Sequence, residues 1–297
     1  MYKAYALLLL ATFVWAGNSV AGKLAVGHVS PMVLVTARWA IVMAALYAFQ
    51  RKQIAADWPA IRPRLVYLLV LGTLGFTGFS VALYYALVYT TAINGSILQG
   101  GIPLFVFCAS FILFSSRIRV EQAAGFLISF IGVILIAARG DFGKLIALDI
   151  NFGDALMLAA IICYGVYTAM LRSKPLMHWT SLMFILCLGA TLTSLPLLFL
   201  EMAQGATIFP DLQGWSVIVY VVIFPSLLGQ VFYIRAVELI GANRAGLFIN
   251  LLPIWGALLA ITMLGEAFHL YHAAALVMIL AGIGLAEYGG QKLSKRE

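Results

Sequence analysis

Charged residues are scarce in this chain of 297 residues, because only 10% are Asp, Glu, Lys or Arg, whereas 64% are hydrophobic. Soluble globular domains carry about 25% charged and about 45–50% apolar residues, so this composition excludes an ordinary soluble protein. A membrane β-barrel is also excluded, because its strands would alternate apolar and polar residues instead of forming continuous apolar runs. The composition therefore indicates a helical integral membrane protein.

Cysteine and the usual catalytic motifs are also rare or missing. The three cysteines, Cys108, Cys163 and Cys187, have no metal-binding spacing, and we expect each to be a buried small apolar residue. His269 and His272 are three residues apart without a third ligand, so we expect them at the membrane interface and not on a metal. The sequence has no HExxH or GxSxG motif. We therefore predict no enzyme activity, no catalytic residues, no metal and no cofactor.

What the sequence does contain is long apolar stretches. Ten of them, each of roughly 17 to 25 residues, are long enough to cross the roughly 30 Å hydrocarbon layer of a bilayer as a helix. They lie near residues 4–22, 32–50, 65–89, 95–115, 120–138, 153–171, 180–200, 214–238, 244–264 and 270–288.

The chain also contains an internal repeat. The stretch 84–103 (YYALVYTTAINGSILQGGIP) returns as 234–253 (IRAVELIGANRAGLFINLLP), and this offset of 150 residues aligns Pro103 with Pro253. Both copies show an apolar helix, a corner of small residues and a second apolar helix with a proline. Because each half holds five spans, an odd number, the second copy must enter the membrane from the opposite side. We therefore predict an all-α integral membrane fold with ten transmembrane helices in two inverted five-helix repeats.

The repeat sets the expected domain boundaries. We place the first repeat at residues 1–139, an external linker at 140–152, the second repeat at 153–290 and a cytoplasmic tail at 291–297. The first stretch resembles a secretory signal, with a lysine before it and Ser-Val-Ala near its end. We expect it to be retained, because its removal would leave nine spans and break the repeat.

Basic residues outnumber acidic ones by 18 to 11. In a soluble chain this excess could indicate a nucleic-acid partner, but here the basic residues follow the loops. If the N-terminus is cytoplasmic, all except Lys23, Arg38, Arg139 and Lys144 fall in cytoplasmic segments, as the positive-inside rule requires. We therefore predict a multi-pass protein of the cell (inner) membrane with both termini cytoplasmic and no nucleic-acid partner. The sequence leaves the oligomeric state open, and a monomer is compatible with it.

Two polar residues lie at membrane depth in the first two spans. Asn18 must find a hydrogen-bond partner there, either in a cavity or on a neighbouring helix. Arg38 is costly in the membrane unless it is paired or hydrated, so it either reaches the outer interface, lines water or binds backbone carbonyls. Lys23, at the end of the first span, is expected to extend to the interface.

The third and eighth spans are weakened at corresponding places, since Gly75 in one stands opposite Pro225 in the other. Such paired interruptions are the best sequence pointer to a substrate site at the midplane between repeats, although tight packing would also explain the glycines. We assign hinge or packing roles to Gly75, Gly78, Pro103, Pro225, Gly229 and Pro253, and cavity-lining, substrate-binding roles to Trp15, Asn18, Arg38, Tyr84, Tyr85, Gln99, Tyr164, Tyr167, Gln230, Asn250 and Trp255.

Four features occur together in this chain: Trp-Ala-Gly-Asn at 15–18, Thr-Ala-Arg-Trp at 36–39, the corners at Pro103 and Pro253, and Gly265-Glu266. In these features and over nearly its whole length the chain resembles the EamA branch of the drug/metabolite transporter superfamily. The resemblance implies ten helices in two inverted repeats and the export or exchange of small metabolites, with YddG-like amino-acid exporters as the nearest models. The first repeat departs from the family in having Ser115-Ser116 where Gly-Glu is common, so a role for the acidic helix end can be carried onto Glu266 only.

We therefore expect a secondary transporter that moves a small organic metabolite by alternating access. Interior cations without interior anions favour a solute with a carboxylate, the aromatic residues favour an apolar part, and an amino acid fits both. Riboflavin, a nucleotide-like metabolite or an organic cation is also compatible with the aromatic residues. A channel or a lipid/isoprenoid flippase is the alternative of a different class. Every Asp is expected in a loop and every Glu near a helix end, so the coupling ion stays open.

Overall fold

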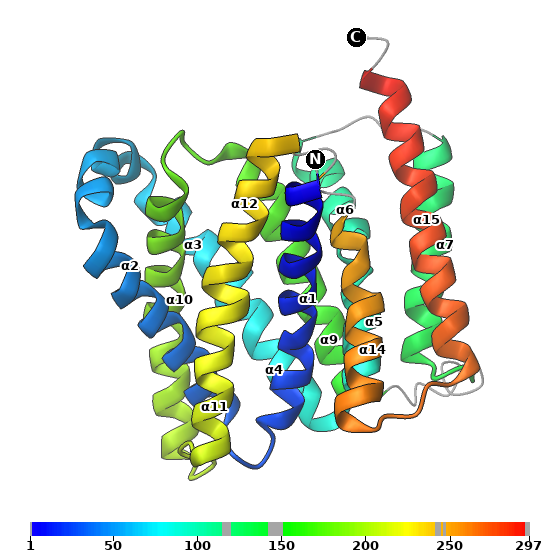
Figure 1. Cartoon of the computed structure of the whole chain (residues 1–297), viewed down its shortest axis with the longest axis horizontal. Helices are drawn as coiled ribbons and strands as arrows, with labels where there is room; N and C mark the ends of the chain where they lie inside the picture. Colours follow the sequence, from blue (N-terminus) through cyan, green and yellow to red (C-terminus); the bar gives the residue numbers. More distant parts are fainter. Residues whose placement is uncertain (1, 115–119, 142–150, 241–244, 246–247, 295–297) are drawn as a thin grey trace.

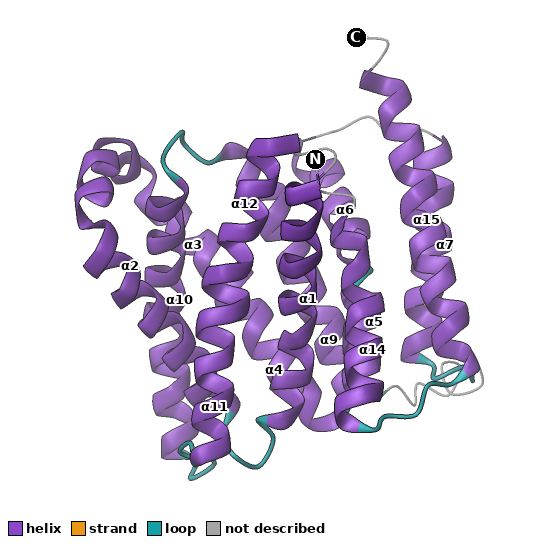
Figure 2. Cartoon of the chain, in the orientation of Figure 1, coloured by secondary structure: helices purple, strands orange, loops and turns teal. Residues whose placement is uncertain are grey.

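The computed structural model describes residues 2–114, 120–141, 151–240, 245 and 248–294, with side chains described as far as residue 286. All of its elements are helices, and the described residues contain no strand (Figure 2). By length and composition, seven helical stretches in this part of the chain can cross a membrane, and two shorter apolar helices cover Phe248–Leu264 and Leu270–Ala286. The predicted all-α integral membrane fold is therefore confirmed at this level. The predicted linker at 140–152 lies largely outside the described residues, and the predicted tail at 291–297 is described only as far as Ser294, where it continues the last helix.

In chain order the helices are α1 (Tyr2–Leu24), α2 (Pro31–Ile61), α3 (Leu65–Gly72), α4 (Phe79–Tyr89), α5 (Ala92–Gln99), α6 (Ile102–Phe114), α7 (Val120–Ala137), α9 (Phe152–Met170), α10 (Trp179–Ala203), α11 (Leu212–Val221), α12 (Gly229–Ile240), α14 (Leu252–Leu264) and α15 (Leu270–Ser294). Short non-α segments continue some of them: η1 (Arg62–Arg64), η2 (Thr73–Gly78), η3 (Leu171–Ser173), η4 (Val222–Leu228) and η5 (Phe248–Leu251). The predicted third span is therefore α3, η2 and α4 in succession, and the predicted eighth span is α11, η4 and α12.

Helix α2 is longer than the sequence predicts. It begins at Pro31, after Ser30 in an extended conformation, because proline fits the first turn of a helix. It then continues to Ile61, with Pro59 near its end. The prediction of a loop at residues 51–64 is therefore wrong for most of its length. Proline this close to a helix end breaks few intrahelical hydrogen bonds, and the residues before it favour helix.

The largest contacts between helices join the first half of the chain to the second. Helix α7 packs on α15, α2 on α10, α4 and α6 on α9, α1 on α12 and α14, and α5 on α14. At the 150-residue offset α1 corresponds to α9, so the pair α1–α12 corresponds to α9–α4 and the pair α1–α14 to α9–α6. The pairs α2–α10 and α7–α15 each correspond to themselves. This pattern is the one that a two-fold relation between the halves would produce.

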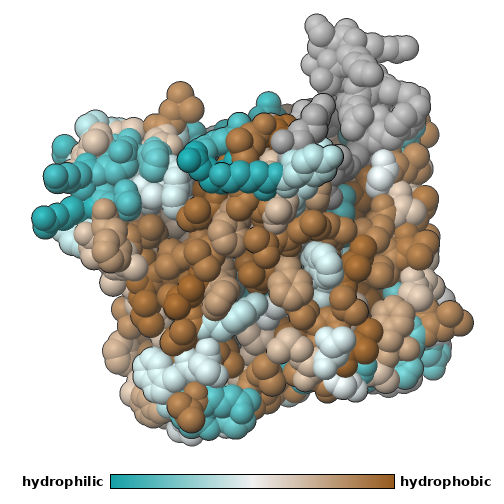
Figure 3. Space-filling view, viewed as in Figure 1, coloured by the Kyte–Doolittle hydropathy of each residue, from teal (hydrophilic) through white to brown (hydrophobic). Residues whose placement is uncertain are grey.

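Helix α1 begins and α15 ends on the same side of the bundle, at the top of Figure 1. We call this side the N-side, and the opposite side, where α1 ends and α2 begins, the far side. Figure 3 shows a broad apolar band across the middle of the molecule, with hydrophilic residues gathered at its two ends. Such a band suits insertion in a bilayer, whose hydrocarbon core is flanked by polar interfaces.

The three cysteines differ in their surroundings. Cys187 is buried, Cys163 is partly buried and Cys108 is exposed. The prediction of burial is therefore wrong for Cys108, which shares an outward-facing side of α6 with the exposed Phe111 and Ile112. A helix that faces lipid tolerates a small apolar side chain on its outer surface as readily as in its core.

Candidate functional site

The helices weakened at corresponding places are interrupted by π-helical segments. Segment η2 spans Thr73–Gly78, and segment η4 spans Val222–Leu228, which begins 149 residues later. Gly75 lies in the first segment and Pro225 in the second. The prediction that the two helices are weakened in register is confirmed. Single-turn π segments inside α-helices are frequently found at functional sites.

The π segment η4 redirects backbone groups toward side chains. Pro225 has no N–H, and the carbonyl of Val221 instead accepts a hydrogen bond from the Ser226 hydroxyl at 2.7 Å. Gly229 donates its N–H to the carbonyl of Phe224, five residues back, where an α-helix would use Pro225. The carbonyl of Pro225 accepts instead from the indole Nε1 of Trp15 at 2.9 Å. The proline therefore ties α1 to the interrupted helix.

Two glycines allow aromatic side chains to approach the interrupted helices. A Cβ atom on Gly229 would lie 2.5 Å from Nε1 of Trp15, and a Cβ atom on Gly75 would lie 2.3 Å from the ring of Tyr167. Neither distance is compatible with a side chain larger than hydrogen. The glycines predicted as hinges therefore make room for two aromatic residues that line the cavity described next.

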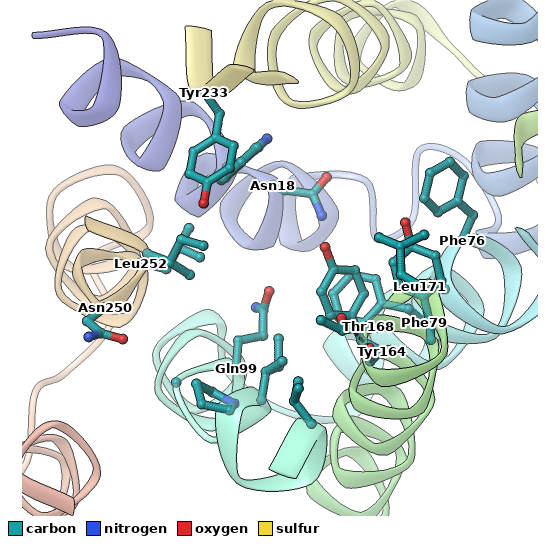
Figure 4. Close-up of a pocket in the computed structure, with 18 of the residues that line it drawn as sticks. Asn18, Phe76, Phe79, Gln99, Tyr164, Thr168, Leu171, Tyr233, Asn250 and Leu252 are labelled. Atoms are coloured by element: carbon teal, nitrogen blue, oxygen red, sulfur yellow. Dashed lines mark hydrogen bonds between the residues drawn. The ribbon is translucent and has the colours of Figure 1, made fainter. Parts of the chain in front are cut away.

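A cavity of about 780 Å³ lies between residues of both halves. Its wall includes Asn18 and Arg38 toward the far side and reaches Leu171 and Trp179, where α9 ends and α10 begins on the N-side. The far-side helix ends contribute none of its described wall residues. Figure 4 shows Asn18, Gln99 and Tyr233 pointing into this space from three different helices. The cavity therefore extends toward the N-side and stops short of the far side.

Two broken helices contribute to the same wall. Helix α5 ends at Gln99, and α6 begins at Ile102 with Pro103 in its first turn. Helix α14 likewise begins with Pro253 in its first turn, after the 3₁₀ segment η5. Both prolines line the cavity. We predicted them inside continuous spans, but they stand where a new helix begins, because proline lacks the N–H that the first turn does not need.

Arg38 is the only charged side chain among the described residues of the wall, and it is 6% exposed. Its Nε donates to the Ser226 hydroxyl at 2.8 Å, and its Nη1 donates to Asn18 Oδ1 at 3.1 Å and to the Tyr84 hydroxyl at 2.7 Å. All three acceptors are neutral. Its guanidinium also lies 4.4 Å from the centre of the Trp39 ring. Of the three positions predicted for Arg38, the structure supports the lining of a cavity.

One side of the cavity is aromatic. Phe76 lies 5.9 Å from Tyr167, and Tyr167 lies 5.4 Å from Tyr164, measured between ring centres. Phe79 continues the group, 5.0 Å from Tyr164. These rings come from α9 and from the segments around η2, so the aromatic wall spans both halves. It offers an apolar surface next to a single buried cation.

Most of the predicted site residues come together in this cavity, and a few do not. Its wall contains the predicted residues Trp15, Asn18, Arg38, Gly75, Gln99, Pro103, Tyr164, Tyr167, Pro225, Gln230, Asn250 and Pro253. Gly78 and Gly229 are not part of the described wall. Trp255 packs edge-on against Phe13, with ring centres 5.6 Å apart, and is not part of the described wall. Tyr84 reaches the wall residues Arg38 and Asn18 through its hydroxyl only.

Tyr84 separates the cavity from a second, smaller hollow of about 250 Å³ on the far side. Tyr85 and Glu201 line this hollow, so Tyr85 does not face the main cavity. Glu201 is 4% exposed and accepts hydrogen bonds from the Tyr85 hydroxyl at 2.8 Å, from the Ser30 hydroxyl and from the backbone of Met32. It thereby joins α10 to the start of α2 and the end of α4.

Lys23 and Glu266 close the far-side corner between α4 and α5. Lys23 Nζ donates to the carbonyls of Leu87 and Thr90 at 2.8 and 2.7 Å, and Glu266 accepts from the N–H groups of Ala92 and Ile93 at 2.8 and 2.9 Å. A cation at a helix C-terminus and an anion at a helix N-terminus both complement the helix dipole. The sequence predicted that Lys23 extends to the interface but did not reveal that the carbonyls at the end of α4 hold it.

A buried network lies beside this corner. Asp154 is fully buried in the first turn of α9, where it accepts from the Thr90 hydroxyl and from Asn94 Nδ2 at 3.3 Å, with Arg139 Nε at 3.8 Å. His272 is 2% exposed, and its Nε2 lies 3.0 Å from Asn94 Oδ1. The predictions of a loop position for Asp154 and of an interfacial His272 are therefore wrong. Asn151 accepts from Gly153 N at 2.8 Å and caps the start of α9. Because Asn is a favoured N-cap residue, it is the sequence signal that places Asp154 in the first turn of a helix.

The described residues contain no group of three or more His, Cys, Asp or Glu side chains placed to hold a metal ion. The arrangement instead offers a guanidinium with neutral partners, uncharged polar groups and aromatic rings around a space of metabolite size. Pockets of about 300–1,000 Å³ hold small molecules. Chemically, this site can bind an organic anion with an apolar part.

Comparisons with known proteins point in one direction. The model of the EamA-like transporter family matches the chain twice, at residues 2–138 and 151–287. A protein of Bacillus subtilis (strain 168) named uncharacterized transporter YyaM is 25% identical over 266 residues, which cover 88% of this chain and 86% of that protein. A protein of Salmonella typhimurium named probable amino-acid metabolite efflux pump is 25% identical over 302 residues, covering 95% of this chain and 94% of that protein.

One solved crystal structure is similar in fold. It superposes on the present structure with a TM-score of 0.63 over 99% of both chains, at 20% sequence identity. At this identity the similarity concerns the fold alone.

Proposed function

Because this chain belongs to the EamA-like transporter family, we propose that it is a secondary transporter that exports an amino acid or a related carboxylate across the inner membrane by alternating access. The observation that carries the proposal is the cavity of about 780 Å³, which reaches the N-side and has Arg38 as its single described charge. A carboxylate satisfies a buried guanidinium, and the aromatic wall accepts an apolar side chain. The relative named an amino-acid metabolite efflux pump supports the same substrate class.

The architecture that we propose for this function has ten spans in two inverted repeats. The repeats cover residues 1–139 and 153–290, joined by an external linker, and both termini are cytoplasmic. The self-corresponding pairs α2–α10 and α7–α15 support this arrangement, as do the two matches to the family model. With this orientation the N-side is cytoplasmic, and the cavity is open inward and closed outward.

Other solutes fit the cavity less well. An organic cation would find no acidic side chain among the described wall residues, and a nucleotide-like metabolite would place a phosphate with more than one negative charge next to one arginine. A channel needs a continuous water-filled path, whereas the Arg38–Tyr84–Asn18 hydrogen bonds separate the two hollows. These points favour a carrier over a pore.

Counterflow in proteoliposomes tests the proposed function. Purified protein is reconstituted, the vesicles are loaded with a mixture of unlabelled amino acids at millimolar concentration, and a labelled amino acid is added outside at micromolar concentration. A carrier gives a transient, saturable accumulation of label that Arg38→Gln strongly reduces. Ohmic current without such accumulation would instead support a channel.

A further inference from the structure

Three hydrogen-bond donors at the cavity have no acceptor among the described residues. Arg38 uses Nε and Nη1 for its bonds to Ser226, Asn18 and Tyr84, and Nη2 makes no hydrogen bond to the described residues. The indole Nε1 of Trp39 and the hydroxyl of Ser80 are buried and have no partner. All three residues line the cavity, and Trp39 and Ser80 are 5% and 0% exposed. These donors were not recognised from the sequence, because only their assembly from α2 and α4 makes them a group.

The three residues meet along one side of one helical stretch. Phe76, Ser80 and Tyr84 recur at intervals of four residues, which places them on one side of the helical stretch formed by η2 and α4. Tyr84 accepts from Arg38 at 2.7 Å, and Phe76 stacks on Trp39 with ring centres 4.3 Å apart. Ser80 therefore lies one turn from Tyr84, which bonds Arg38, and one turn from Phe76, which stacks on Trp39. It is on the side of the helix that faces α2.

Buried donors without acceptors are costly, and most buried indole N–H and hydroxyl groups in proteins are paired. We infer that Arg38, Trp39 and Ser80 form an oxyanion subsite that takes the carboxylate of the transported solute. This inference rests on the proposed function and adds two residues to it. Trp39 Nε1 and Ser80 Oγ are covered by neighbouring side chains in this conformation, so the anion completes the subsite as those side chains move aside.

The charge of the subsite selects its ligand. One guanidinium balances one negative charge, and its planar fork matches the two oxygens of a carboxylate. A phosphate monoester carries about −1.5 to −2 near neutral pH and would leave charge buried without a partner. Ser226, Asn18 and Tyr84 hold the guanidinium in place, and the aromatic wall receives the apolar remainder of the ligand. The subsite is therefore suited to a monocarboxylate.

Binding of three matched probes to the full-length protein in detergent tests the ligand class. The probes are 3-phenylpropionate, its neutral amide 3-phenylpropionamide and phenyl phosphate, each measured by isothermal titration calorimetry. We expect the carboxylate to bind at least about tenfold more tightly than either of the others, which is the effect of one charge-assisted hydrogen bond. Equal affinity for acid and amide, tighter binding of the phosphate, or no binding of 3-phenylpropionate would overturn the subsite.

Substitutions test the two newly assigned donors. Ser80→Ala and Trp39→Phe each remove one donor, and each is expected to weaken 3-phenylpropionate binding about tenfold while changing amide binding little. Thr36→Val is the matched control, because Thr36 also has a buried hydroxyl without a partner on α2 but does not line the cavity. Unchanged carboxylate affinity in folded Ser80→Ala and Trp39→Phe proteins contradicts the assignment.

The subsite and the proposed function fail in different ways. If amino-acid counterflow is present in the wild type and Ser80→Ala and Trp39→Phe leave its half-saturating concentration unchanged, the carrier stands and the subsite is wrong. If no labelled amino acid shows counterflow, the proposed function is wrong whatever the probes do.

Discussion

The two ends of the helix bundle differ in how they are held together. On the far side, buried or partly buried charged groups join helix ends that are distant in the sequence: Lys23 and Glu266 at the corner between α4 and α5, Asp154 beside it, and Glu201 at the start of α2. On the N-side the cavity reaches the helix ends, and the ion pair Arg235–Glu238 is exposed and lies within one helix.

This difference explains how such a fold can favour a conformation that is closed on the far side. Charge-assisted hydrogen bonds to helix ends are strong where water is excluded, and they must break before the far-side ends can separate. Exposed ion pairs contribute little, because water and salt screen them. The structure is therefore closed on the far side for a physical reason, and substitutions at matched positions on the two sides test that reason.

Removal of the Asp154 carboxylate is expected to have the largest effect. Asp154→Ala leaves Thr90 and Asn94 buried without their acceptor, so we expect a loss of about 2–4 kcal/mol in the free energy of unfolding. Denaturation in detergent, followed by tryptophan fluorescence, measures this loss. Asp57→Ala on the N-side, where the carboxylate accepts from Gln53 and the His178 backbone, is the matched control, with an expected loss below about 1 kcal/mol. Equal losses in the two variants would contradict the comparison.

Glu266→Gln should have the next largest effect. The amide keeps the shape but removes the charge that accepts from Ala92 N and Ile93 N, so we expect a loss of about 1–2 kcal/mol. The same change in the exposed ion pair, Glu238→Gln, should cost less than about 0.5 kcal/mol. A cost for Glu238→Gln as large as that for Glu266→Gln would mean that the two sides are held equally well.

Lys23→Met is expected to cost about 1 kcal/mol, because the side chain keeps its length and loses two hydrogen bonds to the carbonyls of Leu87 and Thr90. Thermal unfolding of the detergent-solubilised protein measures this effect. In addition, the loss of Lys23 should have little influence at high salt, since part of the interaction with the helix end is electrostatic. An unchanged or raised melting temperature at low salt would show that Lys23 does not hold this corner.

The smallest effect is expected at the exposed surface of the far side. Asp211 accepts from Gly214 N at 2.8 Å and lies 2.7 Å from His28 Nδ1, and these hydrogen bonds, the one to His28 first, lower the pKa of its carboxyl. A carboxyl whose pKa is lowered by folding stabilises the fold above its unfolded pKa of about 3.9 and loses this contribution as the pH falls through the folded value. Asp211→Asn should therefore reduce the difference in melting temperature between pH 6 and pH 3 slightly. A larger difference than in the wild type would contradict this assignment.

The sequence predicted the helical class, the weakened helices and part of the cavity wall, because these follow from hydropathy, glycine, proline and the 150-residue register. It did not predict the partners of the charged groups on the far side. Lys23 was expected at the interface and Asp154 in a loop, since their partners lie on helices far away in the chain. Trp255 and Tyr85 were expected at the cavity, but aromatic composition does not say which side of a helix faces inward. The role of Ser226, next to Pro225, becomes visible only with the π segment, where its hydroxyl donates to the carbonyl of Val221.

The most direct test of the account is the accessibility of the cavity from each side of the membrane. Ile102→Cys places a thiol in the cavity wall, in a background where Cys108, Cys163 and Cys187 are replaced by alanine. A membrane-impermeant thiol reagent is then added to vesicles of known orientation, without solute. We expect labelling from the side that carries the N-terminus and little from the opposite side. Labelling from both sides at similar rates, or from the opposite side alone, would contradict a carrier that is closed by its far-side hydrogen bonds.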